Sequence, residues 1–295
     1  YRLGGEVVGF DNPGNTSVSK GESLKDTVMV VGGYTDLIVI RHPREGAAAA
    51  AALYSRVPII NAGDGGHLHP TQTLTDLVTL YNEKGRLDHL CIGLCGDLIY
   101  GRTVHSLIKT MTRFPGNRFV LISTPELALP RYVKDVMDAA GCPWSEVSSL
   151  EEALPELDVL YMTRIQQERF ADGSQYEKQK GVFVLDRAKL AHAKPDLKIL
   201  HPLPRVNEIT TEVDEDPRAT YFRQTVYGMY ARMALILTIL QGAHIRPAAG
   251  TFHSTHPNVC SNPNCITQTE PYLPHLFTEA GDMLICAYCD GRTLI

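Results

Sequence analysis

Two cysteine pairs near the C-terminus have the spacing of a structural zinc site. Cys260 and Cys265 are separated by four residues and Cys286 and Cys289 by two, with 20 residues between the pairs. Four thiolates at such spacing typically hold Zn²⁺ in tetrahedral geometry. Residues 252–295 are too few to fold on an apolar core alone, so the bound metal would supply folding free energy. A redox dithiol at the second pair is the alternative, and the first pair argues against it.

Arginine and histidine recur shortly after successive short apolar runs of the sequence. These residues are Arg41, His69, Arg102, Arg164 and Arg205. Because ligands of open α/β sheets bind at the carboxyl ends of strands, we expect these side chains to gather at one rim. Guanidinium groups match carboxylate and phosphate oxygens in pairs of hydrogen bonds. In a chain with a net charge of −5, this pattern predicts anionic substrates.

The apolar runs themselves predict an α/β fold built on parallel sheets. Continuous rather than alternating apolar runs are typical of strands that are buried on both faces. The expected strands are 36–40, 57–60, 90–95, 119–122, 159–162, 182–185 and 198–200. Amphipathic segments between or after them predict helices at 46–54, 71–84, 103–113, 130–140 and 227–241.

Composition narrows the class of protein. With 44% hydrophobic and 21% charged residues, the chain is too apolar to be disordered. Its mild acidity argues against nucleic-acid and membrane-surface partners, which attract basic proteins. No apolar stretch reaches the roughly 18 to 20 residues of a membrane span. Seven cysteines are too few for a disulfide scaffold, so we expect a cytoplasmic protein.

Seven segments, in order and with consistent spacing, resemble aspartate carbamoyltransferase catalytic chains. They are 20–24, 41–46, 61–65, 69–74, 96–106, 161–166 and 201–205. Residues 252–295 resemble the zinc domain of that enzyme's regulatory chain. The resemblance implies two doubly wound parallel-sheet lobes of the transcarbamylase type, followed by a small β-rich domain that binds zinc.

The resemblance also implies a division into domains. Residues 1–84 would form a carbamoyl phosphate-binding lobe without its N-terminal part, and 85–220 an aspartate-binding lobe. Residues 221–241 would be a C-terminal helix that returns to the first lobe. A linker at 242–251 would precede the zinc domain at 252–295.

The implied activity is transfer of a carbamoyl group from carbamoyl phosphate to L-aspartate in pyrimidine biosynthesis. Arg41, His69 and Gln72 match residues that contact the donor, and Arg41 and His69 would polarise its carbonyl group. Hydrogen-bond donors placed at a developing oxyanion can contribute on the order of 3 kcal/mol each. The reaction would need no catalytic metal and no organic cofactor.

The acceptor side is implied in the same way. Arg102, Arg164 and Gln166 match aspartate-binding residues, and the backbone of Pro202 and Leu203 matches a further substrate contact. Two arginines would attract a dicarboxylate and repel the cationic side chain of ornithine. The forms His-Pro-Thr-Gln and His-Pro-Leu-Pro-Arg also favour aspartate over ornithine.

The resemblance further implies an assembly. Ser17 and Lys20 match a mobile loop that reaches into the active site of a neighbouring subunit. We therefore expect a homo-oligomer of catalytic trimers with shared active sites, which the zinc domains could pair into larger particles.

One departure keeps alternatives open. The family's phosphate-binding Ser-Thr-Arg-Thr segment does not occur in these 295 residues, so we expect a fragment of a longer chain. The alternative function is a noncatalytic regulatory or assembly subunit that retains the aspartate lobe and the zinc module. A transcarbamylase for another amino acid is the third hypothesis.

Overall fold

The computed structural model describes residues 1–12, 14, 16–165, 181–242 and 253–294. Contacts divide the chain into two compact units, here called unit 1 (Tyr1–His69 with Met233–Ile295) and unit 2 (Pro70–Arg232). The domain ranges expected from the sequence stay a prediction. Within the described residues, every helix is too short or too polar to cross a membrane.

Unit 2 is built on one parallel sheet of five strands in the order β5-β4-β3-β6-β7. The strands are β3 (Cys91–Cys95), β4 (Arg118–Ile122), β5 (Trp144–Val147), β6 (Val159–Met162) and β7 (Lys198–Leu200). All residues of β3 and β6 are buried, as continuous apolar runs predict. The chain adds β4 and β5 on one side of β3 and then places β6 on the other. The topological switch point therefore lies between β3 and β6.

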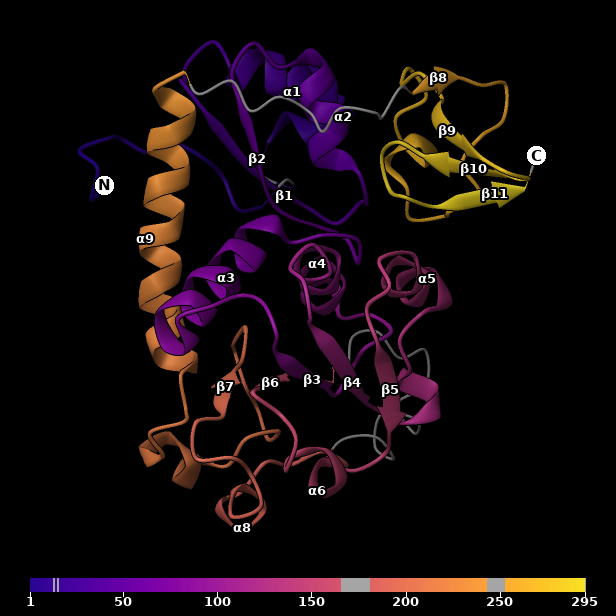
Figure 1. Ribbon diagram of the computed structural model, residues 1–295. Coiled ribbons are helices and arrows are strands. Elements are labelled where there is room, and N and C mark those ends of the chain that lie inside the picture. Colours follow the sequence, from indigo (N-terminus) through magenta and orange to yellow (C-terminus); the bar gives the residue numbers. More distant parts are fainter. Residues whose placement is uncertain (13, 15, 166–180, 243–252, 295) are drawn as a thin grey trace. The chain divides into compact units, whose positions relative to one another are not determined.

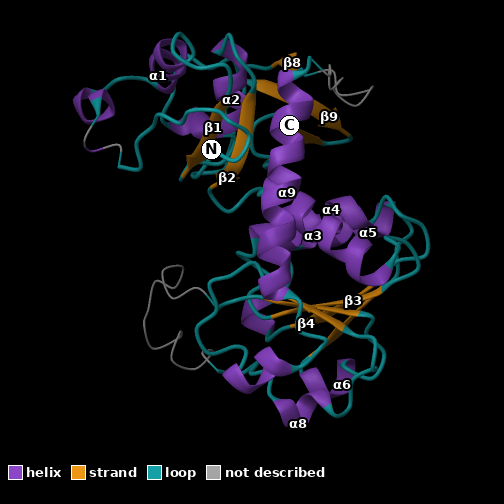
Figure 2. Ribbon diagram, turned by 90° about the vertical axis from the view of Figure 1, so that its left-hand side faces the viewer, coloured by secondary structure: helices purple, strands orange, loops and turns teal. Residues whose placement is uncertain are grey.

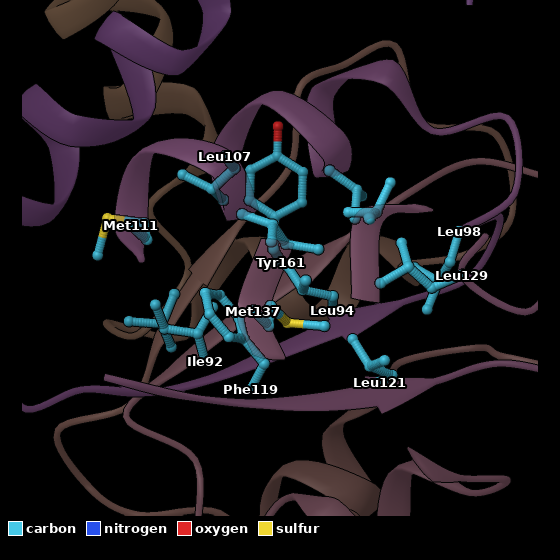
Figure 3. Packing of buried hydrophobic residues seen from close by; sticks show 14 of the residues in the cluster. Ile92, Leu94, Leu98, Leu107, Met111, Phe119, Leu121, Leu129, Met137 and Tyr161 are labelled. Carbon is cyan, nitrogen blue, oxygen red and sulfur yellow. The ribbon is translucent and has the colours of Figure 1, made fainter. Parts of the chain in front are cut away.

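Helices cover both faces of this sheet (Figures 1 and 2). On one face lie α3 (Pro70–Lys84), α4 (Arg102–Met111) and α5 (Arg131–Ala139), and on the other α6 (Leu150–Ala153) and α8 (Arg187–Leu190). Alternate residues of β3 serve the two faces, since Ile92 joins one apolar cluster and Cys91 the other. Figure 3 shows the first cluster, with Leu107 and Met111 of α4 near Tyr161 of β6.

The part of the long helix α9 (Tyr221–Leu240) that belongs to unit 2, residues 221–232, packs closely on α3. A Cβ atom at Gly228 would lie 2.7 Å from Thr75 Oγ1 of α3, so only glycine permits this approach. Tyr221, Gln224, Gly228 and Ala231 are buried at spacings of three and four residues, the pattern of one helical face.

Unit 1 contains two small sheets. One is parallel, with β1 (Ile38–His42) and β2 (Ile59–Asp64), and is accompanied by α1 (Leu24–Val31) and α2 (Ala47–Tyr54). The other is antiparallel in the order β11-β10-β9-β8, formed by β8 (Ser254–Thr255), β9 (Leu276–Ala280), β10 (Met283–Cys286) and β11 (Arg292–Leu294). Buried residues of α1 and α2 share one apolar cluster with those of the second sheet.

One strand expected from the sequence is wrong. Segment 182–185 does not join the sheet of unit 2. Instead, Leu185 donates a hydrogen bond to the carbonyl of Glu208 and accepts one from the Thr210 N–H, which makes an isolated bridge to Ile209. An apolar run can therefore be buried by pairing with a nearby loop. The structure also adds β5 and α1, which the apolar pattern did not predict.

Candidate active site and metal centre

One buried carboxylate holds the loop of unit 1 that carries His69. Asp64 is 2% exposed and accepts hydrogen bonds from the Gly46 N–H (2.7 Å) and the Asn61 side chain (3.0 Å). His67 Nδ1 lies 3.1 Å from the same carboxylate. Burial alone would raise the pKa of Asp64, but the hydrogen bond and charge of His67 more than offset burial, so the pKa lies below its usual range. Asp64 is thus an ionised hub for this loop.

Arg41 lies in β1, beside this loop. Its side chain is exposed, and the next residue, His42, accepts a hydrogen bond from the Gly65 N–H at its carbonyl oxygen (2.9 Å). His69, the last residue of unit 1, is partly buried and comes directly before α3. Arg41 and His69, which we expect to contact carbamoyl phosphate, are therefore positioned by β1 and by the loop after β2.

Gln72 lies in the first turn of α3, in unit 2. It is 8% exposed, and its Nε2 donates a hydrogen bond to Asp76 Oδ1 one turn along the helix (2.8 Å). Asp76 is fully buried, and sequence analysis did not identify it. Its signal is only a carboxylate four residues after a glutamine, on the face of α3 that turns to the core.

Arg102 and Arg164 follow the two strands that border the switch point. Arg102 is the first residue of α4, after the loop that leaves β3, and Arg164 comes two residues after the end of β6. Both side chains are partly exposed. Because ligands of open α/β sheets bind at the switch point, the two arginines lie where an anionic ligand is expected.

Close backbone contacts hold the ends of β3 and β6 together. The Thr163 hydroxyl donates to the Cys95 carbonyl (2.8 Å) and accepts from the Asp97 N–H (3.0 Å). Gly96 has φ +112°, and a Cβ atom there would lie 2.5 Å from the Thr163 carbonyl oxygen, so this position requires glycine. A small cavity opens beside it, lined by Gly96, Thr163, Ile165, Gly181, Phe183, Asn207 and Glu208.

The segment 201–208 forms a closed loop after β7. His201 Nε2 lies 2.8 Å from Glu208 Oε1, with both side chains buried, and the Leu203 N–H donates to His201 Nδ1 (2.8 Å). Because Nδ1 accepts a hydrogen bond, Nε2 of His201 carries the proton and donates a hydrogen bond to Glu208. Burial would raise the pKa of Glu208, but this hydrogen bond and those from backbone N–H groups lower it below the usual value. Leu203 has φ 52°, a conformation that costs energy and that the loop enforces.

Two expectations about the arginines need correction. The arginines belong to two sheets and not to one, because Arg41 lies in β1 of the two-stranded sheet of unit 1, whereas Arg102 and Arg164 follow strands of the sheet of unit 2. Arg205 is not presented to a ligand, since both its terminal nitrogens bind the carboxylate of Asp214. It also donates to the Tyr221 hydroxyl (3.1 Å), so its contacts hold the loop in shape.

The other residues predicted to contact substrate lie in three separate parts of the chain. Pro202 and Leu203 lie in the loop described above and are partly exposed. Ser17 and Lys20 lie in a short 3₁₀ helix, η2 (Ser17–Lys20), and both are exposed. Gln166 lies outside the described residues. These assignments stay predictions.

The four cysteines of unit 1 come together as a potential metal-binding group. They are Cys260, Cys265, Cys286 and Cys289, all buried, and their sulfur atoms lie within 4.8 Å of one another. The first and last sulfur atoms are 3.6 Å apart, and the middle two are 3.9 Å apart. Tetrahedral zinc with Zn–S bonds of about 2.3 Å requires sulfur separations of about 3.8 Å. The donor set and its spacing therefore fit a four-thiolate zinc site.

Polar groups lie close to two of the four sulfur atoms. Asn262 Nδ2 and the Gly291 N–H each lie 3.4 Å from the Cys289 sulfur, and Thr267 Oγ1 lies 3.2 Å from that of Cys265. Hydrogen bonds from the other three thiols and then from Thr267 hold the pKa of Cys265 far below the ordinary thiol value, whereas hydrogen bonding within the cluster raises the pKa of Cys260 and Cys289. Such outer donors typically tune metal sites.

The part of unit 1 that contains the four cysteines, residues 253–294 and here called the metal module, is joined to the β1–α2 connection. The Glu45 N–H donates to the Asn264 carbonyl (3.0 Å), and the Ile266 N–H donates to the Glu45 carbonyl (2.9 Å). Asn262 Nδ2 also donates to the Glu45 carboxylate (2.7 Å). At Gly46 a Cβ atom would lie 2.6 Å from the Tyr288 carbonyl oxygen, so glycine permits the contact.

Comparison with known families covers all three parts of the chain. Residues 1–82 match the aspartate/ornithine carbamoyltransferase carbamoyl-P binding domain, and residues 88–239 match the Asp/Orn binding domain of the same family. Residues 259–293 match the metal binding domain of the aspartate carbamoyltransferase regulatory chain. The chain therefore belongs to the aspartate/ornithine carbamoyltransferase family, with a regulatory-chain metal-binding domain on its C-terminal side.

Relatives with curated names are aspartate carbamoyltransferase catalytic subunits. That of Clostridium perfringens is 58% identical over 240 residues, which is 81% of this chain and 78% of the relative. That of Lachnoclostridium phytofermentans is 56% identical over 239 residues, with the same coverage of both chains. The resemblance predicted from the sequence is confirmed, and within the family it favours aspartate over ornithine.

Similar solved structures are also aspartate transcarbamoylases. The catalytic subunit of M. jannaschii aspartate transcarbamoylase is 46% identical, with a TM-score of 0.76 and coverage of 83% of this chain and 79% of that chain. Aspartate transcarbamoylase from Trypanosoma cruzi, in complex with N-(phosphonacetyl)-L-aspartic acid, is 40% identical, with a TM-score of 0.75 and coverage of 81% and 76%. The predicted fold class is confirmed.

Proposed function

We propose that the protein transfers the carbamoyl group of carbamoyl phosphate to the amine of L-aspartate, giving N-carbamoyl-L-aspartate and phosphate in de novo pyrimidine biosynthesis. The observation that carries this proposal is the pair Arg102 and Arg164, which follow the strands bordering the switch point of unit 2. The 58% identity to an aspartate carbamoyltransferase catalytic subunit supports it.

On the donor side, Arg41 and His69 would donate hydrogen bonds to the carbonyl oxygen of carbamoyl phosphate. That oxygen gains negative charge when the aspartate nitrogen attacks the carbon, and preorganised donors stabilise the charge without reorganising. The new C–N bond forms, the C–O bond to phosphate breaks, and phosphate leaves with the electron pair and takes up the proton that the amine loses. Gln72 would bind the carbamoyl amide.

On the acceptor side, Arg102 and Arg164 would each pair with a carboxylate of aspartate. The backbone of Pro202 and Leu203 would add contacts, as would Gln166. Ornithine would bring a cation towards two guanidinium groups, and like charges at close range repel. This charge pattern supports aspartate as the acceptor.

The four-cysteine group would hold structural Zn²⁺, whose role is to supply folding free energy to the small module. The chemistry proposed above uses side chains and backbone groups of the protein, with no catalytic metal or organic cofactor. Ser17 and Lys20 would complete the site of a neighbouring subunit. That contact would make the protein a homo-oligomer of catalytic trimers, with zinc modules joining pairs of trimers. A cytoplasmic location completes the proposal.

The bisubstrate compound bound by the Trypanosoma cruzi enzyme offers a test. N-(phosphonacetyl)-L-aspartate combines a phosphonate with a dicarboxylate, so it should bind the purified protein saturably with one site per chain in calorimetry. Phosphonacetyl-L-ornithine, the matched compound with a cationic side chain, should bind at least tenfold more weakly. Equal affinity for both would contradict the proposed acceptor, and binding of neither would contradict the proposed reaction.

A further inference from the structure

One carboxylate in the core of unit 2 accepts hydrogen bonds from side chains of two helices and one strand. Asp76 of α3 is fully buried, and its Oδ1 accepts from Gln72 Nε2 (2.8 Å) and from Gln224 Nε2 of α9 (2.7 Å). Its Oδ2 accepts from the hydroxyl of Tyr161 of β6 (3.1 Å). Burying a carboxylate is costly even when it is fully hydrogen-bonded, so packing alone does not account for it.

The chemistry of a carboxylate fixes how both glutamines are turned. An ionised Asp accepts hydrogen bonds and donates none, so each glutamine must present its NH₂ group to Asp76. The carboxamide oxygens of Gln72 and Gln224 therefore face away from the carboxylate. Without Asp76 either amide could rotate by half a turn and exchange its donor for its acceptor.

The oxygen of Gln224 has a defined partner. It accepts a hydrogen bond from the His201 N–H (3.1 Å), at the start of the loop that contains Pro202 and Leu203. The His201 ring in turn accepts from the Leu203 N–H (2.8 Å). The orientation of Gln224 is thus transmitted through His201 to the backbone proposed to contact aspartate.

The side-chain oxygen of Gln72 would contact carbamoyl phosphate, the donor of the carbamoyl group. Gln72 keeps 8% of its surface exposed, whereas Asp76 keeps none, so Asp76 can act on a ligand only through its neighbours. Carbamoyl phosphate carries an NH₂ group that can donate to the Gln72 oxygen. Acetyl phosphate has nearly the same shape but carries a methyl group in that place, and a methyl group donates nothing.

We propose that Asp76 is a positioning residue that selects a carbamoyl over an acetyl donor, by turning the Gln72 oxygen towards the carbamoyl NH₂, and that also orders the aspartate-side loop through Gln224 and His201. This inference rests on the proposed function. Figure 3 shows the Tyr161 ring packed among apolar side chains, with its hydroxyl directed out of that cluster. The Tyr161 hydroxyl donates to Asp76 Oδ2, whereas both glutamines donate to Oδ1.

The charge state of Asp76 gives the device a pH dependence. Burial raises its pKa to about 7, although the hydrogen bonds from Gln72, Gln224 and Tyr161 and the charge of Arg232 on α9 act to lower it. Of these four residues, Tyr161 of β6 and Arg232 of α9 carry titratable or charged groups. When Asp76 is protonated it gains a donor and loses acceptor capacity, so the glutamine orientation is no longer enforced.

Donor selectivity is the first test. In the holoenzyme, the inhibition constant of acetyl phosphate divided by the KM of carbamoyl phosphate measures the preference for NH₂ over CH₃. We expect Asp76→Ala to reduce this ratio about tenfold, the effect of one hydrogen bond. Tyr161→Phe, which removes a bond to the same carboxylate, should lower stability and keep the ratio. An unchanged ratio in folded Asp76→Ala protein would overturn the inference.

The second test does not depend on whether Asp76→Ala folds. Asp76→Asn keeps one oxygen that can accept from both glutamines, but has no group that titrates. The wild-type KM for carbamoyl phosphate should rise as pH falls below about 7, and Asp76→Asn should lose that rise. A retained rise would refute the role of Asp76. Failure of the wild-type protein to form carbamoyl-aspartate would instead refute the proposed function.

Gln224→Met separates the two branches of the network. Met is close in shape to Gln but cannot donate to Asp76 or accept from His201. We expect this variant to raise the KM for aspartate several-fold while the donor ratio stays at the wild-type value. A change in the donor ratio alone would show that Gln224 does not serve the aspartate-side loop.

Discussion

At the ends of β3 and β6 lie the single residues that we propose to determine what the sheet of unit 2 binds. Gly96 and Thr163 bring the two strand ends together, and Arg102 and Arg164 follow them. A carboxylate that pairs with a guanidinium group in a closed site is shielded from water. Removing one partner then leaves a charge without compensation.

Arg164→Ala should therefore damage the aspartate side. We expect kcat/KM for aspartate to fall by an amount equivalent to about 2 to 5 kcal/mol, with little change in the KM for carbamoyl phosphate. Steady-state kinetics with each substrate varied in turn measures both. Arg131→Ala is a matched control, because Arg131 is an exposed arginine of α5 paired with Asp135 and Asp138. Wild-type kinetics in Arg164→Ala would sink the assignment.

The residues that we propose to contact substrate were easier to find in the sequence than the residues that hold them. Arg102 and Arg164 were identified because they follow apolar runs and match a family motif. Asp64, Asp76 and Glu208 were not, since each acts through hydrogen bonds to atoms distant in the sequence or hidden by the fold. Arg205 shows the converse, because its type suggested a ligand contact while its position gave it Asp214 as a partner.

At the scale of elements, burial decided what the sequence could predict. The strands β3, β4 and β6 are buried almost throughout, and their continuous apolar runs predicted them. Strand β5 lies at the edge of the sheet and contains Ser145 and Glu146, both exposed, so it carries no such run. Segment 182–185 was apolar for another reason, since it pairs with the loop after β7.

The junction between the first sheet of unit 1 and the metal module contains a histidine between two carboxylates. His67 lies 3.1 Å from Asp64 and 3.1 Å from Asp290, and its side chain is 9% exposed. Burial would lower its pKa, but the hydrogen bonds to Asp290 and Asp64 and their charges raise the pKa to about 9. The protonated ring therefore bridges the two parts of unit 1.

This raised pKa predicts a loss of stability in alkali. The unfolded value is about 6.5, so the contribution is fully present below pH 6.5 and is lost as pH rises through about 9. We expect the free energy of unfolding of unit 1 to fall by about 2 kcal/mol across that range. Urea titrations of wild-type and His67→Gln protein at several pH values measure it. His192→Gln, at an exposed site in unit 2, should behave as wild type. Identical pH dependence in His67→Gln would contradict this role.

At the scale of the whole molecule, the metal module belongs to the core of unit 1. Leu24, Ala47 and Ala51 share one apolar cluster with Ile266 and Phe277. The second sheet has short strands and contributes few apolar residues of its own, so we expect its folding to depend on the metal and on this shared cluster. The sequence predicted the four ligands from their spacing, but the contacts to α1 and α2 follow only from the fold.

Removal of metal should therefore act locally. We expect chelation, or Cys289→Ser, to abolish amide protection in 253–294 and weaken it in α1 and α2, while β3 and β6 of unit 2 stay protected. Hydrogen exchange read by mass spectrometry measures this, alongside metal analysis that should find about one zinc per chain. Cys142→Ser, at a buried cysteine outside the cluster, should keep its zinc. A zinc content near zero in wild-type protein would contradict the site.

The most direct measurement is formation of carbamoyl-aspartate by the purified protein, supplied with carbamoyl phosphate and L-aspartate, with L-ornithine as the control acceptor. The arginines that follow β3 and β6 predict turnover with aspartate and none with ornithine. Turnover with ornithine, or with neither amino acid, would contradict the assignment of this chain as an aspartate-specific carbamoyltransferase.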